Sequence, residues 1–165
     1  MPTPYAHYVG DQNPVELLTN TLEEYRDAAA LLAEASWNSP WAPHKWTLRQ
    51  IMIHVTQWEM ILGHRLTCCV SIPGFAIQPA DQDKLMAHTD GIDGPTAFAA
   101  FEGSRRMNIG LIQALSAADR AKTVQHPEYG TITANDLIVQ IAGHGIHHLK
   151  QIRSALAPKG EEPEI

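Results

Sequence analysis

The sequence predicts an all-α protein that folds as a four-helix bundle. Four long segments each begin with a recognised helix-start signal, and turn-forming residues separate them. No run of residues alternates apolar and polar side chains with the sustained period of two that marks a strand, so no strands are expected. Because a chain of 165 residues is about the size of one domain, we expect four amphipathic helices to bury their apolar faces against one another.

The helices are expected at residues 14–35, 47–70, 95–116 and 133–157. Each start has its own signal: an asparagine cap before proline, two capping boxes, and a glycine–proline pair (Asn13-Pro14, Thr47 to Gln50, Thr133 to Asp136, Gly94-Pro95). Their ends fall where turn-forming or polar residues gather (36–43, 73–74, 116–129 and 158–160). Residues 1–165 are therefore interpreted as one helical domain, with its core at about 13–157 and a polar tail at 158–165.

The longest connection joins the second and third helices at residues 71–93. A short helical turn is expected within it, around Asp81 to His88. Long ordered loops of this kind often carry function, so this connection is a candidate for bordering a site.

Composition excludes several classes of function. The chain has 18 acidic and 12 basic residues and a net charge of −6, so nucleic-acid binding is not expected. The longest apolar stretches, at 51–53 and 137–138, are too short to span a bilayer, and residues 1–10 lack the pattern of a secretory signal. Cys68 and Cys69 are adjacent and have no other cysteine to pair with. We interpret them as small buried residues rather than a redox pair, and we expect a cytoplasmic location.

The nine histidines carry the chemical signal, and the fourth helix is the most informative element. Its core-facing positions follow helical spacing, with apolar residues first and then two imidazoles and an amide (Leu137, Ile141, His144, His148, Gln151, Ala155). Residues four apart lie about 5–6 Å apart on one face, so His144 and His148 can reach one metal ion. A bare H-x-x-x-H is equally consistent with a pair that is hydrogen-bonded in the core or lies on an exposed face.

Two neighbours of this pair refine the interpretation. Gly145 occupies the position of the catalytic glutamate in the H-E-x-x-H motif, so a thermolysin-like mechanism is not supported. His147 lies one position off the core-facing row. It is interpreted as a group that supports the ligands or lies on the surface, with ligation as the alternative.

Two histidines hold a divalent ion weakly, and catalytic sites use three protein ligands. His54 is the candidate for the third, because it lies on an apolar helix face with Ile51, Trp58 and Ile61. Without the histidine pair on the fourth helix, His54 would be interpreted as a hydrogen-bonded core histidine. The other histidines are expected to be solvated (His7, His44, His64, His88, His126).

Two stretches of sequence together resemble a known family. The first runs from Trp46 to His54, and the second comprises His126 to Gly130 followed by His144 to Ile152. They are similar to the DinB/YfiT-like family of metal-dependent bacterial proteins, over about residues 13–157. The resemblance implies an up-down-down-up four-helix bundle with a long connection between helices 2 and 3. It also implies one divalent ion per chain, nickel or zinc, held by three histidines that map to His54, His144 and His148. Dimers and enzymes that use low-molecular-weight thiols occur in this family.

The sequence leaves two classes of function open. The first is a metal-dependent enzyme, a thiol-S-transferase or a hydrolase, acting on a small molecule admitted by the loops at 71–93 and 117–130. The second is a metal-binding or stress-associated protein whose ion is structural. Glu59 is expected to point about 140° away from His54, and no carboxylate is expected on the inner faces, which weakens the hydrolase hypothesis. Candidates for residues that support the ligands are Asn108, Gln151 and His147, with a hydrogen-bonded core amide as the favoured alternative for Asn108.

The loop after the first helix bears on association. It carries three tryptophans within ten residues (Trp37, Trp41, Trp46), more aromatic surface than a connection usually has. Together with the resemblance, this predicts a homodimer; the alternative is that the tryptophans cap the end of the bundle.

Overall fold

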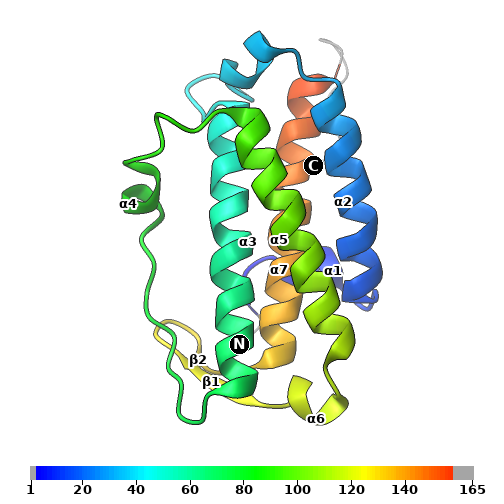
Figure 1. Cartoon of the computed structure of the whole chain (residues 1–165), viewed down its shortest axis with the longest axis vertical. Helices are drawn as coiled ribbons and strands as arrows, with labels where there is room; N and C mark the ends of the chain where they lie inside the picture. The colour runs from blue at the N-terminus through cyan, green and yellow to red at the C-terminus, as the bar shows by residue number, and fades with distance from the viewer. Residues whose placement is uncertain (1–2, 158–165) are drawn as a thin grey trace.

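Four long helices form the protein, as the sequence predicts. The computed structural model describes residues 3–157, and the expected tail at 158–165 lies outside them. The helices are α2 (Pro14–Ala30), α3 (Leu48–Ser71), α5 (Gly94–Ala114) and α7 (Ala134–Leu156). Figure 1 shows α2 and α7 running in one direction and α3 and α5 in the other, which is the expected up-down-down-up order. Helix α3 packs against α5 and α7, and α2 packs against α7 and α5.

The helix starts depend on the capping residues. The side chain of Asn13 accepts a hydrogen bond from the backbone of Val15, and both Thr47 and Thr133 form complete capping boxes. Asp93 caps α5, one residue ahead of the Gly94-Pro95 signal. These side chains satisfy backbone N–H groups that have no partner inside the helix.

The first helix ends earlier than expected, at Ala30 rather than near residue 35. A 3₁₀ helix, η1 (Glu34–Asn38), follows and turns the chain across the end of the bundle. The turn buries Trp37 against the start of α5, where a side chain at Gly94 would come within 2.2 Å of the indole. The alanine-rich sequence alone gives no sign of this end, because the anchor for the turn lies in another helix.

The expectation of no strands is wrong. Residues Thr123–His126 form β1 and Gly130–Thr133 form β2, an antiparallel hairpin in which Val124 pairs with Ile132. Each strand has four residues, too few to show a sustained period of two. A single helical turn, α6 (Ala117–Arg120), precedes the hairpin, and another, α1 (Ala6–Val9), lies near the N-terminus.

The long connection between α3 and α5 returns the chain to the opposite end of the bundle, as two helices of the same direction require (Figure 1). It contains α4 (Gln82–Met86), within the expected helical turn. Side chains of α3 hold it in place: Arg65 donates to the carbonyl of Gln78 at 2.8 Å, and Gln57 donates to that of Leu85 at 2.9 Å. The connection therefore lies against α3.

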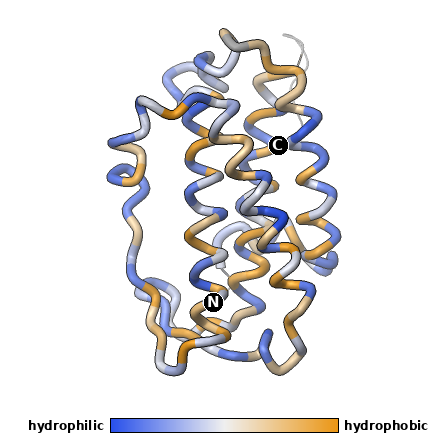
Figure 2. Tube along the Cα trace, viewed as in Figure 1, coloured by the Kyte–Doolittle hydropathy of each residue, from blue (hydrophilic) through white to orange (hydrophobic). Residues whose placement is uncertain are grey.

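The core has two apolar clusters separated by a polar layer. One cluster contains Leu62 and Leu137, and the other contains Tyr25, Phe101 and Leu149. Figure 2 shows hydrophobic and hydrophilic residues alternating along each long helix, as amphipathic helices require. None of the helices within residues 3–157 is long and apolar enough to cross a membrane.

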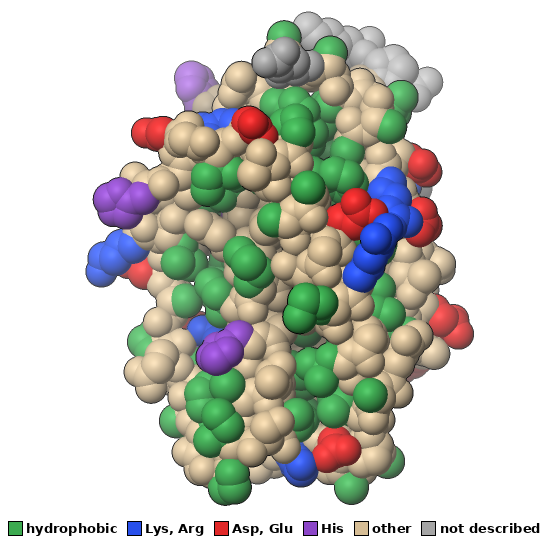
Figure 3. Space-filling view, in the orientation of Figure 1, with side chains coloured by type: hydrophobic (Ala, Val, Ile, Leu, Met, Phe, Trp, Pro, Cys, Tyr) green, Lys and Arg blue, Asp and Glu red, His purple; other side chains and the backbone are tan. Residues whose placement is uncertain are grey.

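An ion pair lies at the centre of the polar layer. Arg105 of α5 has no exposed side-chain surface and donates to both carboxylate oxygens of Glu59, at 2.9 and 2.8 Å. Asn108 donates to the same carboxylate at 2.8 Å, and the hydroxyl of Thr21 accepts from Arg105 at 3.0 Å. Removing one member would leave a buried charge without its partner, so this group fixes how α2, α3 and α5 meet. A second ion-pair network joins Arg26 to Glu23 and Glu102 and links α2 to α5. Figure 3 shows basic and acidic side chains side by side on the surface over these helices.

The segment before α2 crosses α7 at a glycine. A Cβ atom at Gly143 would lie 2.4 Å from the carbonyl oxygen of Tyr5. Tyr5 has a φ of 67°, a conformation that costs energy for any residue with a side chain. The close approach to α7 therefore depends on the missing side chain at Gly143.

We predict that Gly143→Ala lowers the free energy of unfolding by about 1–3 kcal/mol, because the added methyl group pushes the N-terminal segment off α7. Gly103→Ala is the matched control, since a Cβ atom on Gly103 would meet nothing within 4 Å. That change should raise the free energy of unfolding by about 0.5–1 kcal/mol through helix propensity. Urea denaturation measures both. Equal effects of the two substitutions would contradict the packing described.

Candidate metal centre

Three histidines meet in the polar layer. His54 comes from the first half of α3, and His144 and His148 lie one turn apart on α7. All three are buried, with 4%, 7% and 6% of their surface exposed. One ring nitrogen from each lies within 4.8 Å of the other two, and the Nε2 atoms of His54 and His144 are 3.1 Å apart. The structure thus brings together the three residues that the sequence singled out.

The hydrogen bonding of His148 suits a metal ligand. Its Nδ1 lies 2.7 Å from the Oε1 of Gln151, and an amide oxygen only accepts, so Nδ1 carries the proton. Its Nε2 is left with a lone pair and is buried without a partner among residues 3–157, as is the Nδ1 of His54. Unpaired buried polar atoms cost free energy, and a bound cation would satisfy the Nε2 lone pair of His148.

The spacing also fits an ion. Two nitrogens that bind one tetrahedral zinc at about 2.0–2.1 Å lie about 3.3 Å apart, close to the separation of the His54 and His144 nitrogens. A divalent cation thus fits this set of residues.

His147 belongs to a chain of hydrogen bonds that ends at His148. The amide nitrogen of Gln151 lies 3.4 Å from Nε2 of His147, and Nδ1 of His147 lies 3.1 Å from the hydroxyl of Tyr8. Because the Gln151 amide nitrogen donates, Nε2 of His147 accepts and its Nδ1 donates to Tyr8. Both ring nitrogens of His147 are thus engaged away from the three-histidine cluster.

The protein environment keeps the cluster uncharged. Burial, with a smaller effect of His147, lowers the pKa of His54 to about 4. Burial, followed by the charge of His54, lowers the pKa of His148 to about 3. Burial and the neighbouring histidines hold the pKa of His144 well below its ordinary value. Neutral imidazole is the form that binds a metal, so these shifts favour ligation near neutral pH.

The expectation that the inner helix faces carry no carboxylate is wrong. Glu59 is only 3% exposed and lies on the inner face of α3, where Arg105 binds its carboxylate. It does point away from His54. Asn108 is a core amide that donates to Glu59 and does not line the histidine cluster. The same arginine explains Gly145: a Cβ atom there would lie 2.7 Å from Nη2 of Arg105.

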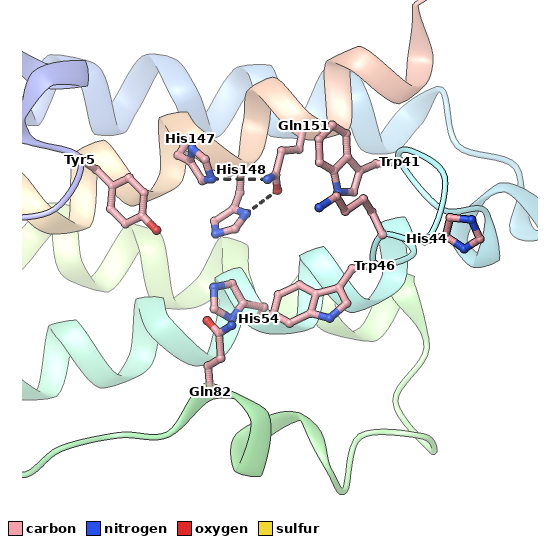
Figure 4. A pocket seen from close by; sticks show the side chains of 10 residues that line it. Tyr5, Trp41, His44, Trp46, His54, Gln82, His147, His148 and Gln151 are labelled. Carbon is pink, nitrogen blue, oxygen red and sulfur yellow. Dashed lines mark hydrogen bonds between the residues drawn. The ribbon is translucent and has the colours of Figure 1, made fainter. Parts of the chain in front are cut away.

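Two neighbouring pockets open onto the cluster. The first has a volume of about 370 Å³, reaches His54 and His148, and is bordered by residues of the loop at 41–46. Figure 4 shows His54 and His148 facing each other across it, with the hydroxyl of Tyr5 pointing towards them. The second has a volume of about 310 Å³ and reaches His54 and His144. Tyr5 and Gln82 border both pockets.

The remaining histidines and cysteines are more varied than expected. His126 is buried, and its Nδ1 accepts hydrogen bonds from the backbone of Glu128 and Tyr129, so the expectation of a solvated side chain is wrong. His44 is exposed but borders the first pocket. Other histidines are exposed, as expected (His7, His64, His88). Cys68 and Cys69 are buried free thiols.

Several pocket residues were missed by the sequence analysis. Trp46 and Trp58 flank His54, with ring centroids 5.0 and 6.3 Å away. Tyr5 packs on His144 at 5.6 Å from a segment expected to lie outside the core. Gln140 lies one turn before His144 on α7. Two of them had a readable signal in their helical spacing: Gln140 lies four residues from His144, and Trp58 lies four residues from His54, with which the sequence already grouped it.

Comparison with known proteins agrees with this site. The family model of the DinB superfamily matches residues 17–152. A protein of Oceanobacillus iheyensis is 29% identical over 110 residues, which cover 66% of this chain and 64% of the relative. A protein of Bacillus mycoides is 25% identical over 147 residues, which cover 84% of this chain and 85% of the relative. Both are provisionally named metal-dependent hydrolases.

Solved structures show the same fold. YfiT from Bacillus subtilis, provisionally described as a metal-dependent hydrolase with an unusual four-helix bundle topology, superimposes with a TM-score of 0.78 at 19% identity. The match covers 86% of this chain and 83% of YfiT. A mycothiol-dependent maleylpyruvate isomerase matches with a TM-score of 0.68 at 14% identity. That match covers 82% of this chain but 57% of the isomerase, and the chain likewise spans less than two thirds of the Oceanobacillus relative.

We predict that the metal-free protein loses stability as the pH falls from about 6.5 towards 4. An unfolded histidine has a pKa of about 6.5, whereas in the fold His54 protonates near pH 4 and His148 near pH 3. The unfolded chain therefore binds more protons in this range, and the free energy of unfolding rises with pH. Urea denaturation of chelator-treated protein across this pH range measures the slope. His144→Gln should reduce the slope by up to about 1.4 kcal/mol per pH unit, and an unchanged slope would contradict the assignment.

Proposed function

The chain belongs to the DinB superfamily, and we propose that it is a metal-dependent enzyme acting on a small molecule, with one divalent ion held by His54, His144 and His148. The observation that carries this proposal is the buried, uncharged histidine cluster. Within it, the Nε2 atom of His148 has no hydrogen-bond partner among the described residues. The names of its relatives and the metal-ligand geometry support a divalent metal.

Nickel and zinc are the proposed metals, because imidazole nitrogen suits both. When bound, such an ion supplies Lewis-acid chemistry: it polarises a carbonyl group or lowers the pKa of a water or thiol. The chain itself supplies the rest. Gln151 fixes the ring of His148 through its Nδ1 proton, and the indoles of Trp46 and Trp58 pack near the ring of His54.

Hydrolysis needs a general base near the metal, and the pockets offer a better candidate for it than the inner helix faces do. Glu59 is engaged by Arg105 and lines neither pocket, so it is unsuited to act as a base. Glu128, however, borders the second pocket and places a carboxylate on the side of the cluster where His144 lies. Transfer of a low-molecular-weight thiol is the second candidate reaction, supported by the fold shared with the mycothiol-dependent isomerase.

A purely structural ion is the alternative role. Structural zinc sites use four protein ligands and are closed to solvent, whereas catalytic sites keep one position open. Here the described residues bring three ligands together, and two pockets reach the cluster. These features favour catalysis.

A homodimer stays a prediction. Trp37 is buried, and Trp41 and Trp46 border the first pocket, so the three tryptophans do not form one exposed patch. The proposal of a dimer therefore depends on the family resemblance alone.

We predict that His144→Ala abolishes stoichiometric binding of zinc or nickel, whereas His147→Ala retains most of it. The reason is that both nitrogens of His147 bind Tyr8 and Gln151 rather than facing the cluster. Elemental analysis and isothermal titration calorimetry measure this. Equal losses in the two variants would show that the ligand set is wrong.

The function itself is tested with the metal-loaded protein. Ester, amide and thiol-plus-electrophile substrates are compared for wild type, His144→Ala and His147→Ala. Turnover that depends on both the metal and His144 supports the proposal. Stoichiometric metal binding without turnover of any of these substrate classes would favour the structural role.

A further inference from the structure

The second pocket contains polar groups that no part of the metal site uses. It lies beside His144, between α3, α7 and the N-terminal segment. Trp58 and Gln140 border this pocket, and the Nε1 of Trp58 and the Oε1 of Gln140 are buried without a hydrogen-bond partner among residues 3–157. Buried polar groups in native proteins are almost always paired, so two unpaired groups in one pocket indicate that something else satisfies them.

The two groups lie at the same level of the bundle for a structural reason. Trp58 is one turn after His54 on α3, and Gln140 is one turn before His144 on α7. Because α3 and α7 run in opposite directions, both positions are displaced from the histidines towards the same end (Figure 1). The indole of Trp58 lies 6.1 Å from the ring of His144, between centroids. The two residues that carry these unpaired atoms thus border one small space.

Tyr5 adds a third group. Tyr5 borders both pockets, and its ring packs against His144. Its hydroxyl forms no hydrogen bond with any residue of the described chain and points towards His54 and His148 (Figure 4). Within residues 3–157 the non-glycine residues with positive φ are Tyr5 and His44, and both border the pockets at the cluster. Such conformations concentrate at functional sites, and here the close packing on Gly143 holds Tyr5 in place.

Charge indicates what kind of group fits. Glu128 is the one charged side chain other than histidine among the described residues that border the second pocket, and it would repel an anion. The first pocket differs, because Lys45 borders it. An uncharged group with both an acceptor and a donor therefore suits the second pocket best.

We infer that the second pocket binds an uncharged amide-type group. Its carbonyl oxygen accepts from the Tyr5 hydroxyl and from Nε1 of Trp58, and its N–H donates to Oε1 of Gln140. The inference deepens the proposed function, because an amide in this pocket lies beside His144. It rests on that function for its chemical meaning, but the binding itself can be measured without the metal.

The test follows the indole signals of the four tryptophans in ¹H–¹⁵N NMR spectra. Trp58→Phe identifies the signal of Trp58 by its loss. Acetohydroxamic acid, which is neutral near pH 7 and presents a carbonyl and an N–H, is titrated into metal-free and zinc-loaded protein, with acetate as the anionic comparison. We expect acetohydroxamic acid to shift the Trp58 signal until it saturates, and acetate to bind with at least about tenfold lower affinity.

Variants then separate binding from folding. Tyr5→Phe and Gln140→Met should each weaken binding about fivefold, the usual effect of one lost hydrogen bond. Gln140→Met should leave the urea midpoint unchanged or higher, since it removes an unpaired buried group, whereas a structural role for Gln140 would lower it. Gln113→Met, at an exposed position on α5, is the matched control and should bind like wild type.

The outcomes distinguish this inference from the proposed function. An unmoved Trp58 signal in both samples, or equal binding by all variants, would overturn the amide-binding pocket even if zinc binds. Failure of zinc to bind, with the Trp58 signal still moving in metal-free protein, would overturn the metal site and support the pocket.

Discussion

Three imidazole rings buried together in the middle of an apolar bundle are the constraint on which the rest of the structure depends. Burial lowers the pKa of His54 and His148 far enough that all three rings are neutral near pH 7. A neutral ring still needs hydrogen-bond partners for its nitrogens. Gln151 provides such a partner for Nδ1 of His148 and for neither of the other two rings. A divalent cation between α3 and α7 would supply what the described chain lacks, and it would hold the two helices together.

The ion pair of Arg105 and Glu59 limits which carboxylates can act as a base near the histidines. It occupies the polar layer next to the histidines and engages the carboxylate nearest to them in sequence. A Cβ atom at position 145 would lie 2.7 Å from the guanidinium, so a side chain there would require Arg105 to shift. Any base must therefore come from the loops, where Glu128 borders the second pocket.

The parts of the fold that local sequence controls could be predicted. Caps such as Thr47 and Thr133 act within one turn, and polar residues on an apolar helix face identify His144 and His148 without knowledge of any partner. Features that depend on distant contacts could not. The early end of α2 follows from the burial of Trp37 against α5, and the position of Tyr5 follows from its packing on Gly143, 138 residues away in the sequence. The pairing of Glu59 with Arg105 likewise joins two helices.

X-ray absorption spectroscopy at the zinc edge tests the central claim most directly, because it reports the atoms bound to the ion rather than its presence. For protein loaded with one equivalent of zinc, the account predicts three imidazole ligands with nitrogens at about 2.0–2.1 Å, together with outer-shell scattering from their rings. His144→Ala should remove one of them or abolish binding. A first shell that contains sulfur, which would implicate Cys68 or Cys69, or fewer than three imidazoles, would contradict the three-histidine site.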